Sequence, residues 1–289
     1  MPNIAYVNGQ FSPLEQATIS IEDRGFQFGD GVYEVVRTYG GVPFRLYDHL
    51  SRLESSARAV SIPVPLSRAD WEALIREGLQ RSDFVSCLVY IQLTRGVAPR
   101  SHLFPSPAKP TVVMTFREIS ETDGVLRQQG VSVVTLLDLR WGRCSIKSLN
   151  LLASVLAKQE ASDAGATEAI LVKDGLVTEG CSSNVCLVRD GAIITPPLSD
   201  QLLAGVTRAT VLELARKAGI VVDEREVPQE ELTQVDELFL IGTTIEVLPV
   251  AALNGVPVGG RTPGPVTQVV SEAFRQCILS ETGQLRRSD

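Results

Sequence analysis

The chain has 289 residues, of which 44% are hydrophobic and 21% are charged, as is ordinary for a globular protein with a well-buried core. This length accommodates one large domain or two medium-sized domains. The net charge of −7 disfavours a polyanionic partner such as nucleic acid or an acidic membrane surface, although it is compatible with a local phosphate site.

The five cysteines are scattered, odd in number and without a CxxC pair, which argues against a disulfide framework or a zinc site. With two histidines, the chain has no HExxH motif. No apolar run approaches membrane-spanning length, and the start MPNIAYVNGQF lacks the basic and apolar regions of a signal peptide. We therefore expect a cytoplasmic enzyme or binding protein that holds no metal and does not associate with membranes.

The first part of the chain has the pattern of hairpins and helices. Gly-containing pairs separate short apolar runs, as in β-hairpins, and two stretches with helical periodicity follow. In chain order we predict hairpin turns at Asn8-Gly9 and Gly40-Gly41, helices over residues 47–60 and 67–82 with Ser67 as an N-cap, and strands over residues 87–96 and 110–116. These elements should form a smaller N-terminal α+β domain at residues 1–119, followed by a linker at residues 120–124.

The second part predicts a larger C-terminal domain at residues 125–289, again of mixed α/β (α+β) type. Its expected elements are a strand over residues 131–141, a helix that follows Lys147 and ends near Gly165, hairpins turning at Asp174-Gly175 and Asp190-Gly191, a helix opening at Gly205, and strands over residues 236–253. GFQFGDG does not match the dinucleotide fingerprint, so we expect no doubly wound nucleotide fold.

Lys147 is the strongest candidate for chemistry. A lysine at a helix N-terminus is electrostatically unfavourable, and the same placement would lower the pKa of its amine, as a Schiff-base lysine requires. A Ser-His-Asp triad lacks a GxSxG elbow, and Cys144 lies among residues typical of an inert thiol. On the residues alone, a solvated surface lysine remains an alternative to the functional one.

A Schiff-base lysine points to pyridoxal phosphate as cofactor, and this cofactor needs other groups in its site that the sequence also offers. Its phosphate needs free backbone N–H groups, which a helix opening at Gly205-Val206-Thr207 offers, and GTT at residues 242–244 offers a second turn with hydroxyl groups. A carboxylate such as Glu179 at a strand end could hold the pyridine nitrogen protonated.

Several motifs then resemble, in order, those of the fold type IV pyridoxal-phosphate aminotransferases, and in particular the bacterial D-amino-acid transaminases. They are IEDRGFQFGDGVYEVVR, DHLSRL, TRGVAPRSH, RWGRCSIKSLNLLASVLAKQEA, EAILVKDGLVTEGCSSNV and GVTR, and the similarity runs from about residue 3 to about residue 275. The resemblance implies a homodimer of two-domain subunits, with pyridoxal 5′-phosphate in the cleft between the domains.

The resemblance also implies roles for individual residues. Lys147 would be the Schiff-base lysine and general base, and the cofactor would further contact Glu179, Arg52, Leu203, Val206, Thr207, Thr243 and Ser183. The substrate carboxylate would be bound by Tyr33, Arg100 and His102, with Arg100 and His102 coming from the neighbouring subunit, and Thr244 would also contact the substrate. Cys181 stands where the family more often has serine, from which we infer no change of reaction.

The implied activity is a ping-pong transamination that moves the amino group of a D-amino acid, such as D-alanine, to a 2-oxo acid, such as 2-oxoglutarate. The PRSH loop favours a small amino acid held through its carboxylate by a charged Arg-His-Tyr set. The alternatives within the same fold are a branched-chain L-amino-acid transaminase, an (R)-amine transaminase and aminodeoxychorismate lyase. A non-catalytic pyridoxal-phosphate-binding homologue is the alternative from a different class.

Overall fold

The computed structural model describes residues 3–119, 124–260 and 262–283. The chain divides into two compact units. The N-terminal unit contains the described residues up to 119 together with Ile146–Asn150 and residues 280–283, and the C-terminal unit contains the other described residues. The linker expected at residues 120–124 lies outside the described residues except for Gly124, which begins a short helix.

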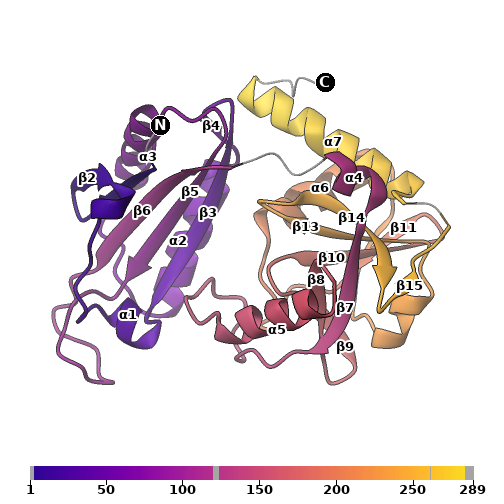
Figure 1. Ribbon diagram of the computed structural model, residues 1–289, viewed down its shortest axis with the longest axis horizontal. Helices are drawn as coiled ribbons and strands as arrows, with labels where there is room; N and C mark the ends of the chain where they lie inside the picture. Colours follow the sequence, from indigo (N-terminus) through magenta and orange to yellow (C-terminus); the bar gives the residue numbers. More distant parts are fainter. Residues whose placement is uncertain (1–2, 120–123, 261, 284–289) are drawn as a thin grey trace. The chain divides into compact units, whose positions relative to one another are not determined.

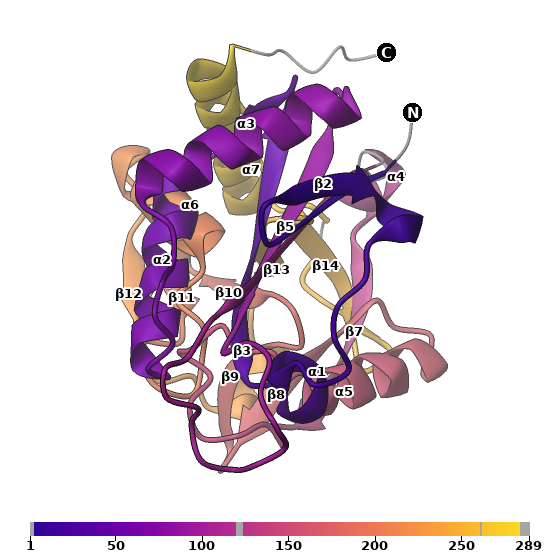
Figure 2. The ribbon, with the colours of Figure 1, turned by 90° about the vertical axis from the view of Figure 1, so that its left-hand side faces the viewer.

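The N-terminal unit is built on a six-stranded sheet with the order β2-β1-β6-β5-β3-β4, in which neighbouring strands are antiparallel. Two helices, α2 and α3, lie against one face of this sheet (Figures 1 and 2). The elements are β1 (Ile4–Val7), β2 (Gln10–Pro13), a 3-10 helix (Leu14–Gln16), α1 (Arg24–Phe28), β3 (Gly31–Tyr39), β4 (Val42–Pro43), α2 (Leu46–Ala59), α3 (Arg68–Ser82), β5 (Cys87–Thr94) and β6 (Thr111–Glu118).

The turn at Asn8-Gly9 and the helix cap at Ser67 are present as the sequence predicted, and local chemistry explains both. The hairpin of β1 and β2 turns at Asn8 and Gly9, whose positive φ angles of 45° and 102° suit a tight two-residue turn. Ser67 caps α3 in a reciprocal capping box with Asp70. Apolar residues of the sheet and of both helices form one buried core around Trp71, which is fully buried.

The C-terminal unit contains a nine-stranded mixed sheet with the order β12-β11-β10-β13-β14-β7-β8-β9, and β15 pairs with β14. Helix α5 packs on β7 and β8, and α6 packs on β12 and β13. The elements are α4 (Gly124–Gln129), β7 (Val131–Leu137), α5 (Leu152–Asp163), β8 (Glu168–Lys173), β9 (Leu176–Gly180), β10 (Asn184–Arg189), β11 (Ala192–Thr195), α6 (Val206–Lys217), β12 (Val222–Glu224), a second 3-10 helix (Gln229–Thr233), β13 (Glu237–Gly242), β14 (Glu246–Leu253), β15 (Val256–Pro257) and α7 (Pro265–Thr282).

The predicted fold class is confirmed, because helices combine with a mixed sheet rather than with a doubly wound parallel one. Both Asp-Gly turns are present, and each aspartate has a positive φ angle, 52° at Asp174 and 51° at Asp190. Helices α1, α4 and α7 had no counterpart in the prediction. Within the described residues, no helix is long and apolar enough to cross a membrane.

One sequence expectation is wrong. Helix α5 begins at Leu152, five residues after Lys147, so Lys147 does not lie at a helix N-terminus. The intervening segment is not helical, because Lys147 C=O and Leu149 N–H form backbone hydrogen bonds with the start of β3, where Ser148 bridges Val32. The argument from the helix dipole therefore does not apply to this lysine.

Candidate active site

Lys147 lies on a segment that pairs with the start of β3. Tyr33 N–H donates to the Lys147 carbonyl oxygen at 3.0 Å, and Leu149 N–H donates to the Gly31 carbonyl oxygen at 3.0 Å. Lys147 N–H donates to the hydroxyl of Ser56 on α2 at 3.1 Å. These bonds fix the backbone of the lysine, and its Nζ lies 4.3 Å from the centroid of the Tyr33 ring. The amine is therefore held over an aromatic face, a favourable position for a cation.

Arg52 of α2 points at β3, where it forms a two-point ion pair with Glu34. Arg52 Nε lies 2.6 Å from Glu34 Oε1, and Nη2 lies 2.9 Å from Oε2. His49 Nδ1 lies 2.8 Å from the same Oε2. Burial by itself would raise the pKa of Glu34, but the charge and hydrogen bonds of Arg52 and the hydrogen bond of His49 lower that pKa to about 2. Glu34 is thus a buried anion that orients the guanidinium of Arg52.

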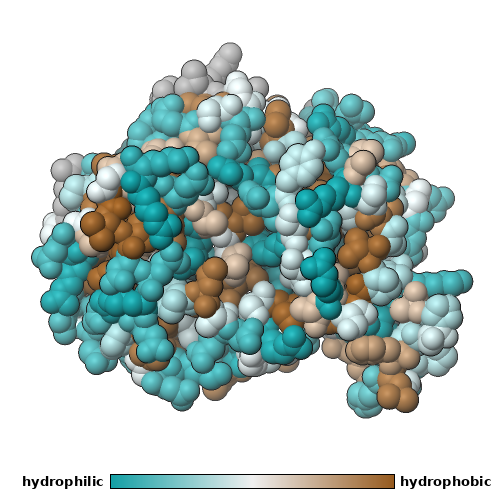
Figure 3. Space-filling model, turned by 180° about the vertical axis from the view of Figure 1, so that it is seen from behind, coloured by the Kyte–Doolittle hydropathy of each residue, from teal (hydrophilic) through white to brown (hydrophobic). Residues whose placement is uncertain are grey.

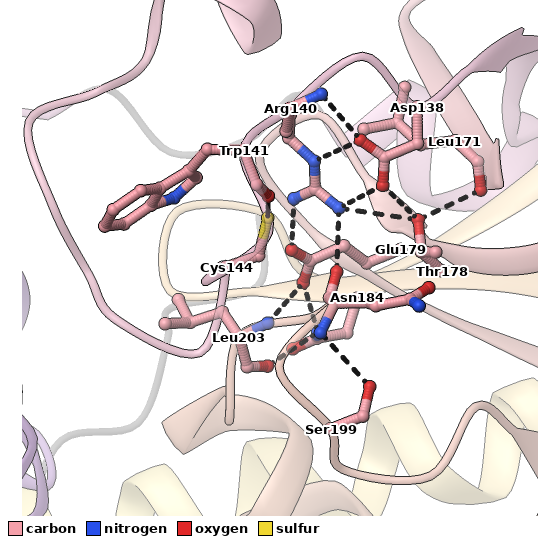
Figure 4. Close-up of polar contacts among 11 residues, drawn as sticks. Asp138, Arg140, Trp141, Cys144, Leu171, Thr178, Glu179, Asn184, Ser199 and Leu203 are labelled. Carbon is pink, nitrogen blue, oxygen red and sulfur yellow. Dashed lines mark hydrogen bonds and ion pairs between the residues drawn. The ribbon is translucent and has the colours of Figure 1, made fainter.

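Glu179 lies near the end of β9 and is held by donors from several elements (Figure 4). Arg140 Nη1 contacts Oε1, whereas Oε2 accepts from Asn184 Nδ2 at 2.9 Å and from the backbone N–H of Leu203 at 3.0 Å. The carboxylate is buried and therefore needs a counter-charge, which the guanidinium of Arg140 supplies. Leu203 and Glu179, which the motifs assigned to the same cofactor, are therefore in direct contact.

A second acidic residue completes this cluster. Asp138, just after β7, pairs with Arg140 Nη2 at 2.7 Å and accepts from the Thr178 hydroxyl at 2.8 Å (Figure 4). Burial would raise the pKa of Asp138, but the hydrogen bonds and charge of Arg140 lower it below its usual value. The cation thus links the carboxylate of Asp138, in the loop after β7, to that of Glu179 on β9, which fixes the position of Glu179.

The start of α6 is shaped to receive an anion. Gly205 is the N-cap, and Val206 and Thr207, which follow it, are buried. A Cβ on Gly205 would overlap with the side-chain oxygen of Asn184, so glycine allows the close approach. Arg208 Nη2 donates to the Pro196 carbonyl at 2.9 Å, which anchors the first turn. The free N–H groups of such a turn bind phosphate.

The remaining predicted residues lie in loops. Thr243 and Thr244 occupy the turn between β13 and β14, and Ser183 is buried just before β10. Arg100 and His102 lie exposed in the loop between β5 and β6.

Five residues of these clusters were not found from the sequence: Glu34, His49, Asp138, Arg140 and Asn184. His49 had a usable signal, because its spacing of three from Arg52 places both on one helix face. Pairing between segments distant in sequence, as between Arg140 in the loop after β7 and Glu179 on β9, leaves no periodic trace in a single sequence. Within the described residues no cluster of three or more His, Cys, Asp or Glu side chains could hold a metal ion.

Comparison with known proteins agrees with these observations. Residues 31–253 match the model of the amino-transferase class IV family. The chain is 42% identical to the D-alanine aminotransferase of Bacillus licheniformis over 277 residues, which is 96% of this chain and 98% of the relative. It is 39% identical to the D-alanine aminotransferase of Listeria monocytogenes serotype 4b (strain F2365), covering 96% of this chain and 97% of the relative.

Solved structures give the same fold. The branched-chain amino acid aminotransferase of Escherichia coli superposes with a TM-score of 0.90 at 27% identity, covering 98% of this chain and 96% of that one. The branched-chain amino acid aminotransferase of T.th., solved with pyridoxamine 5′-phosphate, gives a TM-score of 0.89 at 28% identity, covering 97% of this chain and 95% of that one. The chain belongs to the amino-transferase class IV family.

Proposed function

We propose that this aminotransferase moves the amino group of a D-amino acid, such as D-alanine, to a 2-oxo acid, such as 2-oxoglutarate, with pyridoxal 5′-phosphate as its cofactor. The observation that carries the proposal is that the Lys147 amine lies 4.3 Å from the centroid of the Tyr33 ring. Lys147 is the proposed proton carrier and Tyr33 a proposed carboxylate-binding residue, so the two roles meet at one place. The relatives named D-alanine aminotransferase, at 38–42% identity over nearly the whole chain, support the choice of substrate.

The donors of both units fit the cofactor in kind. A phosphate is matched by the guanidinium of Arg52 and by the N-terminus of α6 at Val206 and Thr207, with the hydroxyl of Thr243 as a further donor. A protonated pyridine nitrogen is matched by the buried carboxylate of Glu179. Leu203, whose N–H holds that carboxylate, and Ser183 complete the set proposed for the cofactor.

When bound, the cofactor supplies an electron-withdrawing ring that acidifies the Cα of an attached amino acid. Glu179 stabilises positive charge at the ring nitrogen, and Arg140 keeps this carboxylate in place. Lys147 would hold the cofactor, and its amine would carry the proton away from the substrate Cα and back. The two half-reactions use one site in turn, which gives a ping-pong scheme.

The substrate carboxylate is bound by Tyr33 together with Arg100 and His102, and Thr244 is a further substrate contact. A guanidinium and an imidazole provide the directional, charge-assisted contacts that a carboxylate selects. Replacing Arg100 with alanine should raise the KM for amino acids far more than the KM for amines. An unchanged ratio of the two KM values would refute this carboxylate site.

The active form is a homodimer in which Arg100 and His102 serve the neighbouring subunit. Helix α5 exposes Leu152, Val155 and Leu156 by 72%, 57% and 62%, a spacing that puts three apolar side chains on one helix face. The loop between β5 and β6, at the lower right of Figure 3, also exposes apolar atoms to solvent. A second copy of the chain is the partner that would cover both surfaces.

The deciding experiment compares D-alanine with L-alanine as amino donor to 2-oxoglutarate. Turnover with D-alanine is expected. Turnover with L-amino acids alone would favour the branched-chain alternative, for which the solved structures at 27–28% identity are the supporting observation. Absence of turnover with either donor, together with cofactor binding, would favour a non-catalytic homologue.

A further inference from the structure

The loop that carries Arg100 and His102 is exposed, yet a buried arginine holds its backbone. Arg24 of α1 donates through Nη1 to the carbonyl oxygens of Ser101 and Leu103, the latter at 3.3 Å. These two carbonyl groups flank His102, so one guanidinium fixes the backbone on both sides of it. Such contacts from a charged donor are stronger than ordinary hydrogen bonds.

The side chains of the loop share one aromatic neighbour, Phe28 at the end of α1. The Arg100 guanidinium carbon lies 4.9 Å from the centroid of the Phe28 ring, and the centroid of the His102 ring lies 5.6 Å from it. Arg24 contacts the same ring at 4.9 Å. Phe28 thus touches both proposed carboxylate-binding side chains and the arginine that fixes their backbone.

The charges around Asp30 indicate that Arg24 does more than pair with this carboxylate. Asp30 accepts from two arginines, from Arg95 Nε and Nη2, both at 2.9 Å, and from Arg24 Nε at 2.7 Å. The two-point contact with Arg95, which also donates to the carbonyl of Val60 at 2.7 Å, would by itself neutralise Asp30. Arg24 is therefore a second buried cation, and its remaining bonds go to the loop.

We propose that Arg24 and Phe28 are positioning residues for substrate binding: Arg24 sets the backbone from Ser101 to Leu103, and Phe28 sets the directions of Arg100 and His102. The loop then presents its two charged side chains in a fixed geometry before a carboxylate arrives, which removes the entropic cost of ordering them. This inference rests on the function proposed above, because it assumes that the loop binds the substrate carboxylate.

The test uses the Arg24→Gln holoenzyme and propanoate, which has a carboxylate and no amino group. The dissociation constant of propanoate, measured from the propanoate-induced rise in Tm, should increase about tenfold, as expected when the displaced loop loses one charge-assisted hydrogen bond to the carboxylate. The KM for D-alanine should rise similarly with a smaller change in kcat, and affinity for pyridoxal phosphate should stay unchanged. Arg81→Gln is the control, since Arg81 also pairs with a carboxylate, that of Glu77, and contacts a phenylalanine ring, but lies exposed and away from the loop.

Two further variants separate the possible outcomes. Phe28→Leu keeps an apolar side chain and should reproduce the loss of propanoate binding even where Arg24→Gln fails to fold. Arg24→Gln added to Arg100→Ala should weaken binding much less than it does alone, because both act through one loop. The inference would be overturned if the losses of propanoate affinity in Arg24→Gln and Arg100→Ala added fully in the double variant. It would also be overturned if Arg24→Gln or Phe28→Leu bound propanoate with wild-type affinity while Arg100→Ala bound it weakly. Wild-type affinity in Arg100→Ala would instead overturn the proposed carboxylate site.

Discussion

Replacing Glu34 with glutamine should destabilise the protein in a manner that depends on pH. The folded pKa of Glu34 is about 2, against an ordinary value of 4.5, which corresponds to about 3 kcal/mol of stability. Because the folded pKa is the lower one, this stability is present above about pH 4.5 and is lost as pH falls toward 2. The side chain is fully buried, so solvent does not screen its pairing with Arg52 and His49.

The measurement is urea unfolding of both proteins at a series of pH values. Near pH 6 the variant should unfold with a free energy about 3 kcal/mol below wild type, and by about pH 3.5 this gap should narrow by about 1 kcal/mol. Glu54→Gln is the control, because Glu54 pairs with the half-exposed Arg68 on the surface and should cost well under about 1 kcal/mol. A gap that stays constant with pH, or that matches the control, would refute the assignment of Glu34 as a buried anion.

The other predictions concern the site and the assembly. Lys147→Ala should lose transamination of D-alanine, and retained turnover would exclude Lys147 as proton carrier. Mixing and refolding Lys147→Ala with Arg100→Ala subunits should restore roughly a quarter of wild-type sites, because half of the dimers are mixed and each holds one complete site; no gain in activity would contradict sharing between subunits. Leu156→Glu should turn the dimer into a monomer by light scattering, whereas an unchanged mass would exclude this face of α5. Gly205→Ala should weaken pyridoxal-phosphate binding about tenfold, because its Cβ would overlap with Asn184; unchanged affinity would argue against a phosphate at α6.

Elements with local signals could be predicted from the sequence. Asn8-Gly9, Asp174-Gly175 and Asp190-Gly191 form turns because their residues tolerate positive φ, a property of the residues themselves. Ser67 and Gly205 begin helices for equally local reasons. The motifs around the proposed cofactor residues could likewise be located, because each is a short contiguous stretch.

Features that depend on distant partners could not be predicted. The sequence predicts that the stretch around Lys147 leads directly into a helix, but hydrogen bonds with Gly31 and Tyr33, more than 100 residues earlier, keep it out of the helix. The cation beside Glu179 could not be predicted for the same reason, since Arg140 lies in the loop after β7, 39 residues before Glu179. The support beneath the loop of Arg100 and His102 also comes from a remote short helix.

The attachment of Ile146–Asn150 to the N-terminal unit has a consequence for biosynthesis. The first sheet lacks one of its partners until the ribosome has made about 150 residues, because Gly31 and Tyr33 take their hydrogen bonds from that segment. A nascent chain that does not yet include this segment has unpaired polar backbone groups at the start of β3. Pairing at the start of β3 must therefore wait during translation until the segment that carries Lys147 has been made.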